Sequence, residues 1–176
     1  MGDFARITVT GIEALKQKLE ALDAALRERV LRSATFAGAD VICRQAIANA
    51  PYYTGEVSEG HPPPGTLKNS IIVKRIEEKC SDYRQTYYIT VRRGKVGGST
   101  DAYYAHMVEY GHFARGAGQA LKGGARSKAT QRVALATSGA KFVPAQPFMR
   151  TAFEMTKNDA TRAIEAKLAE HLKLVK

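Results

Sequence analysis

The sequence of 176 residues predicts an α+β fold, in which a small antiparallel β-sheet packs against a long N-terminal helix and a C-terminal helix. Three observations lead to this class: an apolar stripe at helical spacing near the N-terminus, two strand-like segments in the middle, and a second helical stripe at the C-terminus. With 44% hydrophobic residues the chain can fill a core. Its length fits one domain, residues 1–176.

The N-terminal part predicts a short strand at residues 6–10 and then the long helix. Gly11 ends the strand, and Pro51 ends the helix because the residue before a proline disfavours the helical conformation. We expect so long a helix to bend near residues 33–38. Its charged residues, such as Arg27 and Arg29, predict a solvated outer face. Its apolar stripe recurs every three or four positions, at Ile12, Leu15, Leu19, Leu22, Leu26, Val30, Ala34, Ala37 and Val41.

The middle of the chain predicts a β-hairpin. Residues 56–65 form a Pro-rich insertion, which cannot be helix or central strand. Two segments rich in β-branched and aromatic residues follow, at 70–77 and 85–93, and residues 80–83 suit the connecting loop. The sheet edges left open by so few strands give a natural route to pairing between copies.

Two further helices are predicted. Residues 103–110 form a short helix, with Asp101 as a candidate N-cap and Gly111 as its left-handed stop. Pro147 opens the C-terminal helix at its first turn, where proline is tolerated. The apolar stripe of this last helix consists of Met149, Phe153, Ala160, Ile164, Leu168, Leu172 and Val175.

The net charge of +10 is concentrated in one segment. Residues 111–145 carry six basic residues and no acidic one, which suggests a polyanionic neighbour, either DNA or an acidic protein face. No aromatic residue lies between Phe113 and Phe142, so DNA contact would be non-specific and through phosphate. A solvated surface is the alternative. We predict a basic mobile loop over residues 112–142, with Arg115, Lys122, Arg126, Lys128, Arg132 and Lys141 as candidate contacts.

Catalytic, metal and membrane functions find little support. Cys43 and Cys80 lack metal-site spacing and are expected to be free thiols, so no metal or cofactor is predicted. No apolar run is long enough to cross a membrane, and we expect synthesis in the cytoplasm. A metal-independent ribonuclease could use the cluster from His106 to Arg115, with His106 or Glu109 as base. The simpler interpretation is that Tyr103, Met107 and Tyr110 anchor a helix.

Three motifs resemble those of one known family. They are residues 50–55 (APYYTG) with residues 66–71 (TLKNSI), residues 104–111 (YAHMVEYG), and residues 144–152 (PAQPFMRTA). Their order and combination resemble the neck, or minor tail, protein family of siphophages of the Hong Kong lambdoid type. The insertion at 56–65 and the long segment before the last motif depart from the pattern. Each motif residue has an architectural role, and the set is Pro51, Thr54, Gly55, Glu109, Tyr110, Gly111, Pro147 and Phe148.

The resemblance implies a structural role in the virion at the head–tail junction. It implies a homo-oligomeric ring, hexameric by this resemblance, that binds connector and tail-terminator or tail-tube proteins while DNA passes through its lumen. A structural protein is therefore our first hypothesis, and not an enzyme. A small basic RNA-binding protein or ribonuclease is the second, and a transient tail-assembly factor that leaves the finished particle is the third.

Overall fold

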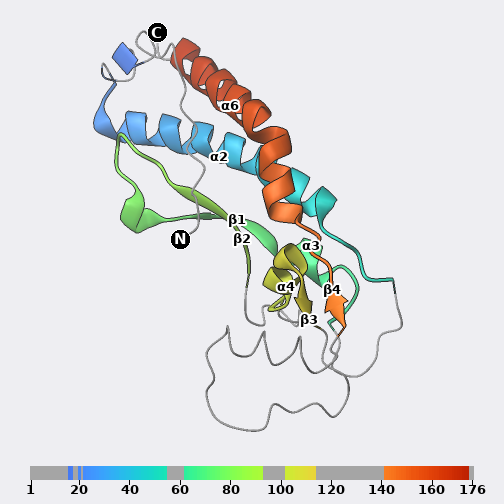
Figure 1. Ribbon diagram of the computed structural model, residues 1–176. Helices are drawn as coiled ribbons and strands as arrows, with labels where there is room; N and C mark the ends of the chain where they lie inside the picture. Colours follow the sequence, from blue (N-terminus) through green and yellow to red (C-terminus); the bar gives the residue numbers. More distant parts are fainter. Residues whose placement is uncertain are drawn as a thin grey trace.

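The computed structural model describes residues 16–17, 20, 22–54, 62–92, 102–113 and 141–174. Over these residues the predicted α+β class is confirmed: helix α2 (Ala24–Asn49) lies between helix α6 (Phe148–Leu174) and a hairpin of strands β1 (Ile71–Arg75) and β2 (Tyr87–Val91) (Figure 1). The predicted strand at 6–10, the cap Asp101, and most of the insertion at 56–65 and of the basic loop at 112–142 lie outside the described residues.

The two long helices pack through rows of residues four apart. In α2 the buried row is Val30, Ala34, Gly38, Ile42 and Ala46, and in α6 it runs from Phe148 through Ala152, Thr156 and Ala160 to Leu168. Rows of this kind interdigitate in the commonest class of helix packing. The predicted stripe is confirmed at Val30 and Ala34 and is wrong at Ala37 and Val41, which are half-buried. Hydrophobicity alone assigned these two positions to the buried face. The close approach of the helices instead requires a small residue at the contact, and Gly38 takes that place.

The expected bend of the first helix is misplaced. Helix α2 is uninterrupted through residues 33–38, and the break lies at Leu22 and Asp23, just before its first residue. The buried guanidinium of Arg27 donates to the carbonyl oxygens of Leu22 (2.7 Å) and Glu20 (3.3 Å) and pairs with Asp82 at 3.0 Å. Arg27 thus supplies hydrogen-bond donors to carbonyl oxygens next to the break. The prediction that Arg27 belongs to the solvated face of the helix is wrong.

The hairpin pairs as predicted but is shorter. Strands β1 and β2 are antiparallel, with Ile71 opposite Val91 and Arg75 opposite Tyr87. A 3₁₀ turn at Glu77–Lys79 and an isolated bridge between Ser81 and Arg84 form the tip. The amide of Arg92 donates to the carbonyl oxygen of Ser70, and that of Ile76 donates to Thr86. With the register above, the even-numbered residues of β2 therefore form the hydrogen-bonded pairs with β1. The backbone polar groups of the odd-numbered residues of β2 therefore point away from β1.

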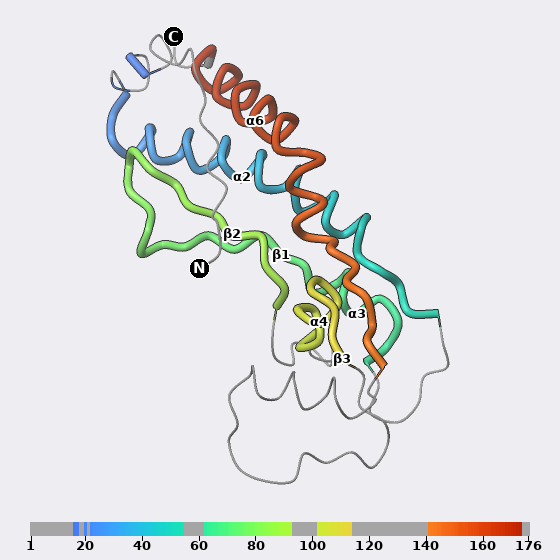
Figure 2. The backbone as a smooth tube through the Cα atoms, in the orientation of Figure 1, coloured from blue at the N-terminus to red at the C-terminus, as the bar shows by residue number. Residues whose placement is uncertain are grey.

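Short elements gather at the end of the molecule where α6 begins (Figure 2). They are helix α3 (Thr66–Ser70), which the sequence did not predict, helix α4 (Ala105–Tyr110), and strands β3 (His112–Phe113) and β4 (Phe142–Val143), which pair antiparallel. The ends of the predicted basic loop are thus strands. Ala50 is extended before Pro51, as predicted.

The crossing of the two long helices gives a first prediction. A Cβ atom at Gly38 would lie 2.6 Å from Cγ1 of Ile164 and 2.9 Å from the carbonyl oxygen of Ala160. We expect Gly38→Ala to destabilise the fold by about 1–3 kcal/mol despite the higher helix propensity of alanine, because the backbone oxygen cannot give way. Thermal unfolding would measure this, with Ala48→Gly on the exposed side of α2 as the propensity control. A Gly38→Ala variant as stable as wild type would contradict this packing.

Candidate interaction site at the α4–α6 joint

The three sequence motifs meet in one core cluster. The first contributes Ala50, Leu67 and Ile71, the second Ala105, and the third Phe148 and Ala152. Phe148 is only 2% exposed and anchors the start of α6, as predicted. The motif residues are therefore brought together by packing.

Glu109 caps helix α6 from a different helix. Its carboxylate accepts hydrogen bonds from the backbone N–H of Met149 (2.9 Å) and of Arg150 (3.0 Å). These are the second and third residues of α6, whose N–H groups an N-cap side chain normally satisfies. Pro147, which precedes the helix, has no side-chain acceptor. A buried carboxylate on α4 supplies that function, and its charge suits the positive end of the helix dipole.

We call the contact between Glu109 of α4 and the start of α6 the joint. Gly111 and the β3–β4 pair lie directly beside it. Gly111 has φ 74° and ψ 163°, a region that is essentially restricted to glycine, so the predicted positive φ is confirmed although the backbone is not in the left-handed helical region. Beyond it His112 pairs with Val143 and Phe113 with Phe142. The amide of Gln146 also donates to the carbonyl oxygen of Val108 at 2.8 Å. The chain segments before and after the basic segment, residues 108–113 and 142–146, are thereby hydrogen-bonded to each other.

A groove of about 760 Å³ lies beside this joint, between the end of β2, helix α4 and the first turns of α6. Its walls include Ile89 and Val91 of β2, His106 and Tyr110 of α4, and Phe153 of α6. In the described part of the chain β2 pairs with β1 alone, so the outward backbone groups of Ile89 and Val91 face a concave surface. An edge strand in a groove can accept a partner's strand.

The described members of the hypothetical ribonuclease cluster, His106, Glu109 and His112, do not form an acid–base site. Nδ1 of His106 lies 2.9 Å from the carbonyl oxygen of Tyr103, and Nδ1 of His112 lies 3.4 Å from that of Met107. Glu109 is engaged with α6, and Arg115 lies outside the described residues. Nothing in the described geometry supports the RNA-binding alternative.

The anchors of α4 also differ from the prediction. Tyr103 and Tyr110 are exposed, and Tyr104, Ala105 and Val108 pack on the core instead. Burial raises the pKa of Tyr104, and a hydrogen bond with the backbone of Leu67 partly offsets this rise. A helix of six residues offers little periodicity, so the sequence could not tell which tyrosine faces inward.

The remaining reactive groups are structural. Cys43 and Cys80 are free thiols, as predicted, although Cys80 is only half-buried. Burial, followed by the charge of Asp40, raises the pKa of Cys43, so the unreactive thiol form is favoured. No group of three or more His, Cys, Asp or Glu residues in the described ranges could hold a metal ion. None of the helices placed there is long and apolar enough for a membrane span.

The predicted contact residues divide into two sets. Lys141 is exposed and lies next to β4, whereas the other five basic residues lie outside the described ranges, as does Gly55. Thr54 is exposed and Pro51 is half-buried after α2. Sequence reasoning missed two features: the buried Arg27, and a pocket lined by Arg29, Arg32 and Arg75. Only the tertiary packing of the hairpin on α2 brings these arginines together.

The joint consists of packing and capping contacts beside an open groove. Residues 13–111, more than half of the chain, match a family described as "HK97-gp10_like: Bacteriophage HK97-gp10, putative tail-component". The chain belongs to this family of bacteriophage tail components. No curated protein and no solved structure gives a significant match.

The engagement of Glu109 gives a prediction about catalysis. We expect the purified protein to cleave neither RNA nor DNA, because in the described residues Glu109 is engaged with α6 and each histidine Nδ1 lies near a backbone carbonyl oxygen. Incubation with labelled RNA would measure this. Cleavage that persists through purification and disappears in His106→Ala or His112→Ala would contradict it.

Proposed function

We propose that this tail component is a ring subunit of the phage neck, which completes the tail and joins it to the head connector. Its role is structural and its place is the virion. The observation that carries the proposal is the convergence of all three motifs on one core cluster beside the Glu109 joint, to which each motif contributes buried packing residues while Glu109 caps α6.

Two surface features support a role in assembly. The groove beside the joint exposes Tyr103 and Tyr110 together with the edge of β2, which pairs with β1 alone over the described residues. Tyrosine is enriched at protein interfaces, and a strand edge allows head-to-tail pairing between copies. Repetition of one heterologous contact generates a ring where the rotation closes, for which six copies is our expectation.

The partners follow from the same proposal. One face of the ring would meet the connector below the head, and the other would meet the tail-terminator or tail-tube protein. The basic segment, with six positive charges and no negative one over residues 111–145, suits an acidic protein face or the DNA in the lumen.

Electron microscopy of the concentrated protein, together with native mass spectrometry, tests the ring. Closed rings of defined stoichiometry support the proposal, whereas a monomer at all concentrations opposes it. A phage that lacks this gene should accumulate filled heads and unjoined tails. Proteomics of purified virions separates a neck subunit, which is retained, from a transient assembly factor, which is lost.

The basic segment gives a further prediction. We expect Arg126→Ser, Lys128→Ser and Arg132→Ser in combination to leave the melting temperature unchanged and to lower the yield of infectious particles, because the charge acts on a partner. Heads that fill but stay tailless would indicate a protein partner, and joined particles that fail in genome retention or ejection would indicate DNA. The matched control removes three surface charges from α6, at Lys157, Arg162 and Lys167, of which Arg162 is exposed and the two lysines are half-buried. Full infectivity of the first variant would show that its charge only serves solubility.

A further inference from the structure

A second concave site lies between helix α2 and the hairpin, away from the joint. It has a volume of about 540 Å³ and is lined by Arg29, Arg32 and Phe36 of α2, Arg75 of β1 and Tyr87 of β2. Three guanidinium groups around one pocket are costly unless anions neutralise them, so their partners decide what the site can do.

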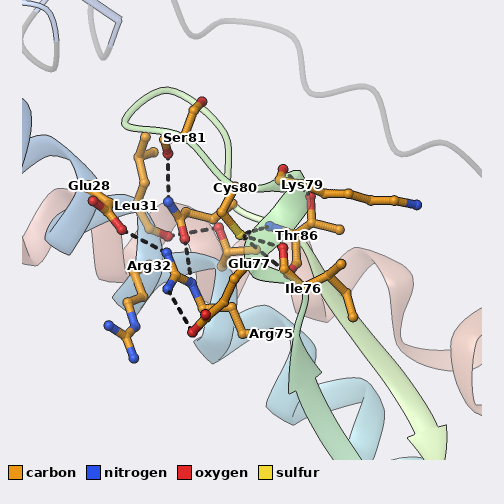
Figure 3. A network of polar contacts seen from close by, with 12 residues as sticks. Glu28, Leu31, Arg32, Arg75, Ile76, Glu77, Lys79, Cys80, Ser81 and Thr86 are labelled. Carbon is orange, nitrogen blue, oxygen red and sulfur yellow. Dashed lines mark hydrogen bonds and ion pairs between the residues drawn. The ribbon is translucent and has the colours of Figure 1, made fainter.

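One of the three arginines is held in place within the protein. Arg75 donates from Nη2 to Glu28 at 2.7 Å and from Nε to Gln85 at 3.0 Å, and its side chain is largely buried. Figure 3 shows its guanidinium between Glu28 and Glu77, and shows that of Arg32 turned away from this network. Over the described ranges no carboxylate lies within 4.0 Å of Arg29 or Arg32, and both are exposed. Among the described residues, the charges of Arg29 and Arg32 at the pocket therefore have no ion-pair partner.

The same pocket offers an apolar surface. The ring of Phe36 is 47% exposed and packs edge-on against Tyr87, with ring centroids 5.9 Å apart. The hydroxyl of Tyr87 donates to the carbonyl oxygen of Arg32 at 3.4 Å, which holds the tyrosine against α2. An exposed phenyl ring beside arginines that have no ion pair within the described ranges is the composition that protein interfaces favour.

We propose that this pocket binds an acidic peptide segment of a partner protein, with an apolar side chain against Phe36 and carboxylates on Arg29 and Arg32. Charge complementarity favours an anionic partner, and planar guanidinium groups suit carboxylates in bidentate geometry. Concavity favours a peptide over duplex DNA, because a pocket of about 540 Å³ can admit a few peptide side chains, whereas duplex phosphates lie along a convex surface. This inference does not depend on ring formation.

Fluorescence anisotropy with labelled probes tests the proposal on the full chain. The main probe is a short peptide of Asp and Glu residues around a central Leu. Comparison probes replace the acids by Asn and Gln, replace the Leu by Ser, or are single-stranded DNA of equal charge. The variant Arg29→Gln/Arg32→Gln is compared with Arg44→Gln/Arg162→Gln, which removes the same charge from exposed sites on α2 and α6.

We expect the acidic Leu peptide to bind best and the pocket variant to weaken it about tenfold, since two exposed ion pairs are lost, while the control variant changes affinity less than twofold. Arg32→Glu and Phe36→Ala should each weaken it too, with melting temperatures near wild type. Equal effects of pocket and control variants, equal binding of the neutral peptide, tighter binding of the DNA, or no binding by any probe would each overturn the proposal.

Discussion

We expect the Glu109→Ala variant to have a markedly lower melting temperature than the wild-type protein. The substitution leaves the N–H groups of Met149 and Arg150 without their acceptor at a buried helix start, and it removes a negative charge from the positive end of α6. We expect a loss of about 2–4 kcal/mol in the free energy of unfolding, which corresponds to about 5–15 °C for a domain of this size.

Two comparison variants isolate the capping role of Glu109. Glu109→Gln keeps one acceptor and should lose about half as much stability, because the amide oxygen can serve only one helix N–H well and the charge is gone. Glu154→Ala removes a carboxylate from the exposed side of α6, where its ion pair with Lys157 contributes about 0.5 kcal/mol or less. If Glu109→Ala were as stable as Glu154→Ala, the contact between α4 and α6 would not be a cap.

Gly111→Val should be the most destabilising single substitution at the joint. The backbone at Gly111 has φ 74° and ψ 163°, which a β-branched residue scarcely adopts, and a Cβ atom would lie 2.9 Å from the carbonyl oxygen of Val143. Strain and collision together should cost about 3–5 kcal/mol. Chemical denaturation would measure the loss, and ring formation would report its effect on assembly.

A graded series separates strain from collision at Gly111. Ala should cost less than Val, because it is smaller and not β-branched, and Asn should not restore stability, because its tolerance of positive φ applies to the left-handed helical region. Lys141→Val is the matched control, since Lys141 is exposed and directly precedes β4, where a β-branched residue is favoured. A Gly111→Val protein with normal stability would show that the chain avoids this conformation in solution.

The sequence predicted the class of fold because its strongest signals are periodic. The two long helices, the hairpin, the stop at Pro51 and the positive φ of Gly111 each follow from local chemistry that the structure retains. Helix α3 escaped prediction, since it has five residues and its threonine bonds back to Pro63 in a way that resembles a turn. The break before α2 depends on a bond from Arg27 to the distant Asp82, which no local pattern reveals.

The candidate site was only partly accessible to sequence reasoning. The motifs drew attention to Glu109, Gly111 and Phe148, which in the structure make a helix cap, a positive-φ link and a buried anchor. Their common purpose, the capping of one helix by another across forty residues, is a property of tertiary structure. The arginine pocket shows the same limit, because Arg32 and Arg75 meet only after the hairpin has packed on α2.

The short β3–β4 pair bears on how far the segment between the two strands can vary in length between related proteins. It fixes the two ends of the intervening segment next to each other, whatever the number of residues between them. By the general scaling of loop closure, doubling such a segment costs only about 0.6 kcal/mol. The match to the family stops at residue 111, just where this pair begins. Insertions and deletions between Phe113 and Phe142 should therefore be accepted readily in evolution, so that one scaffold can carry segments of different length at this end.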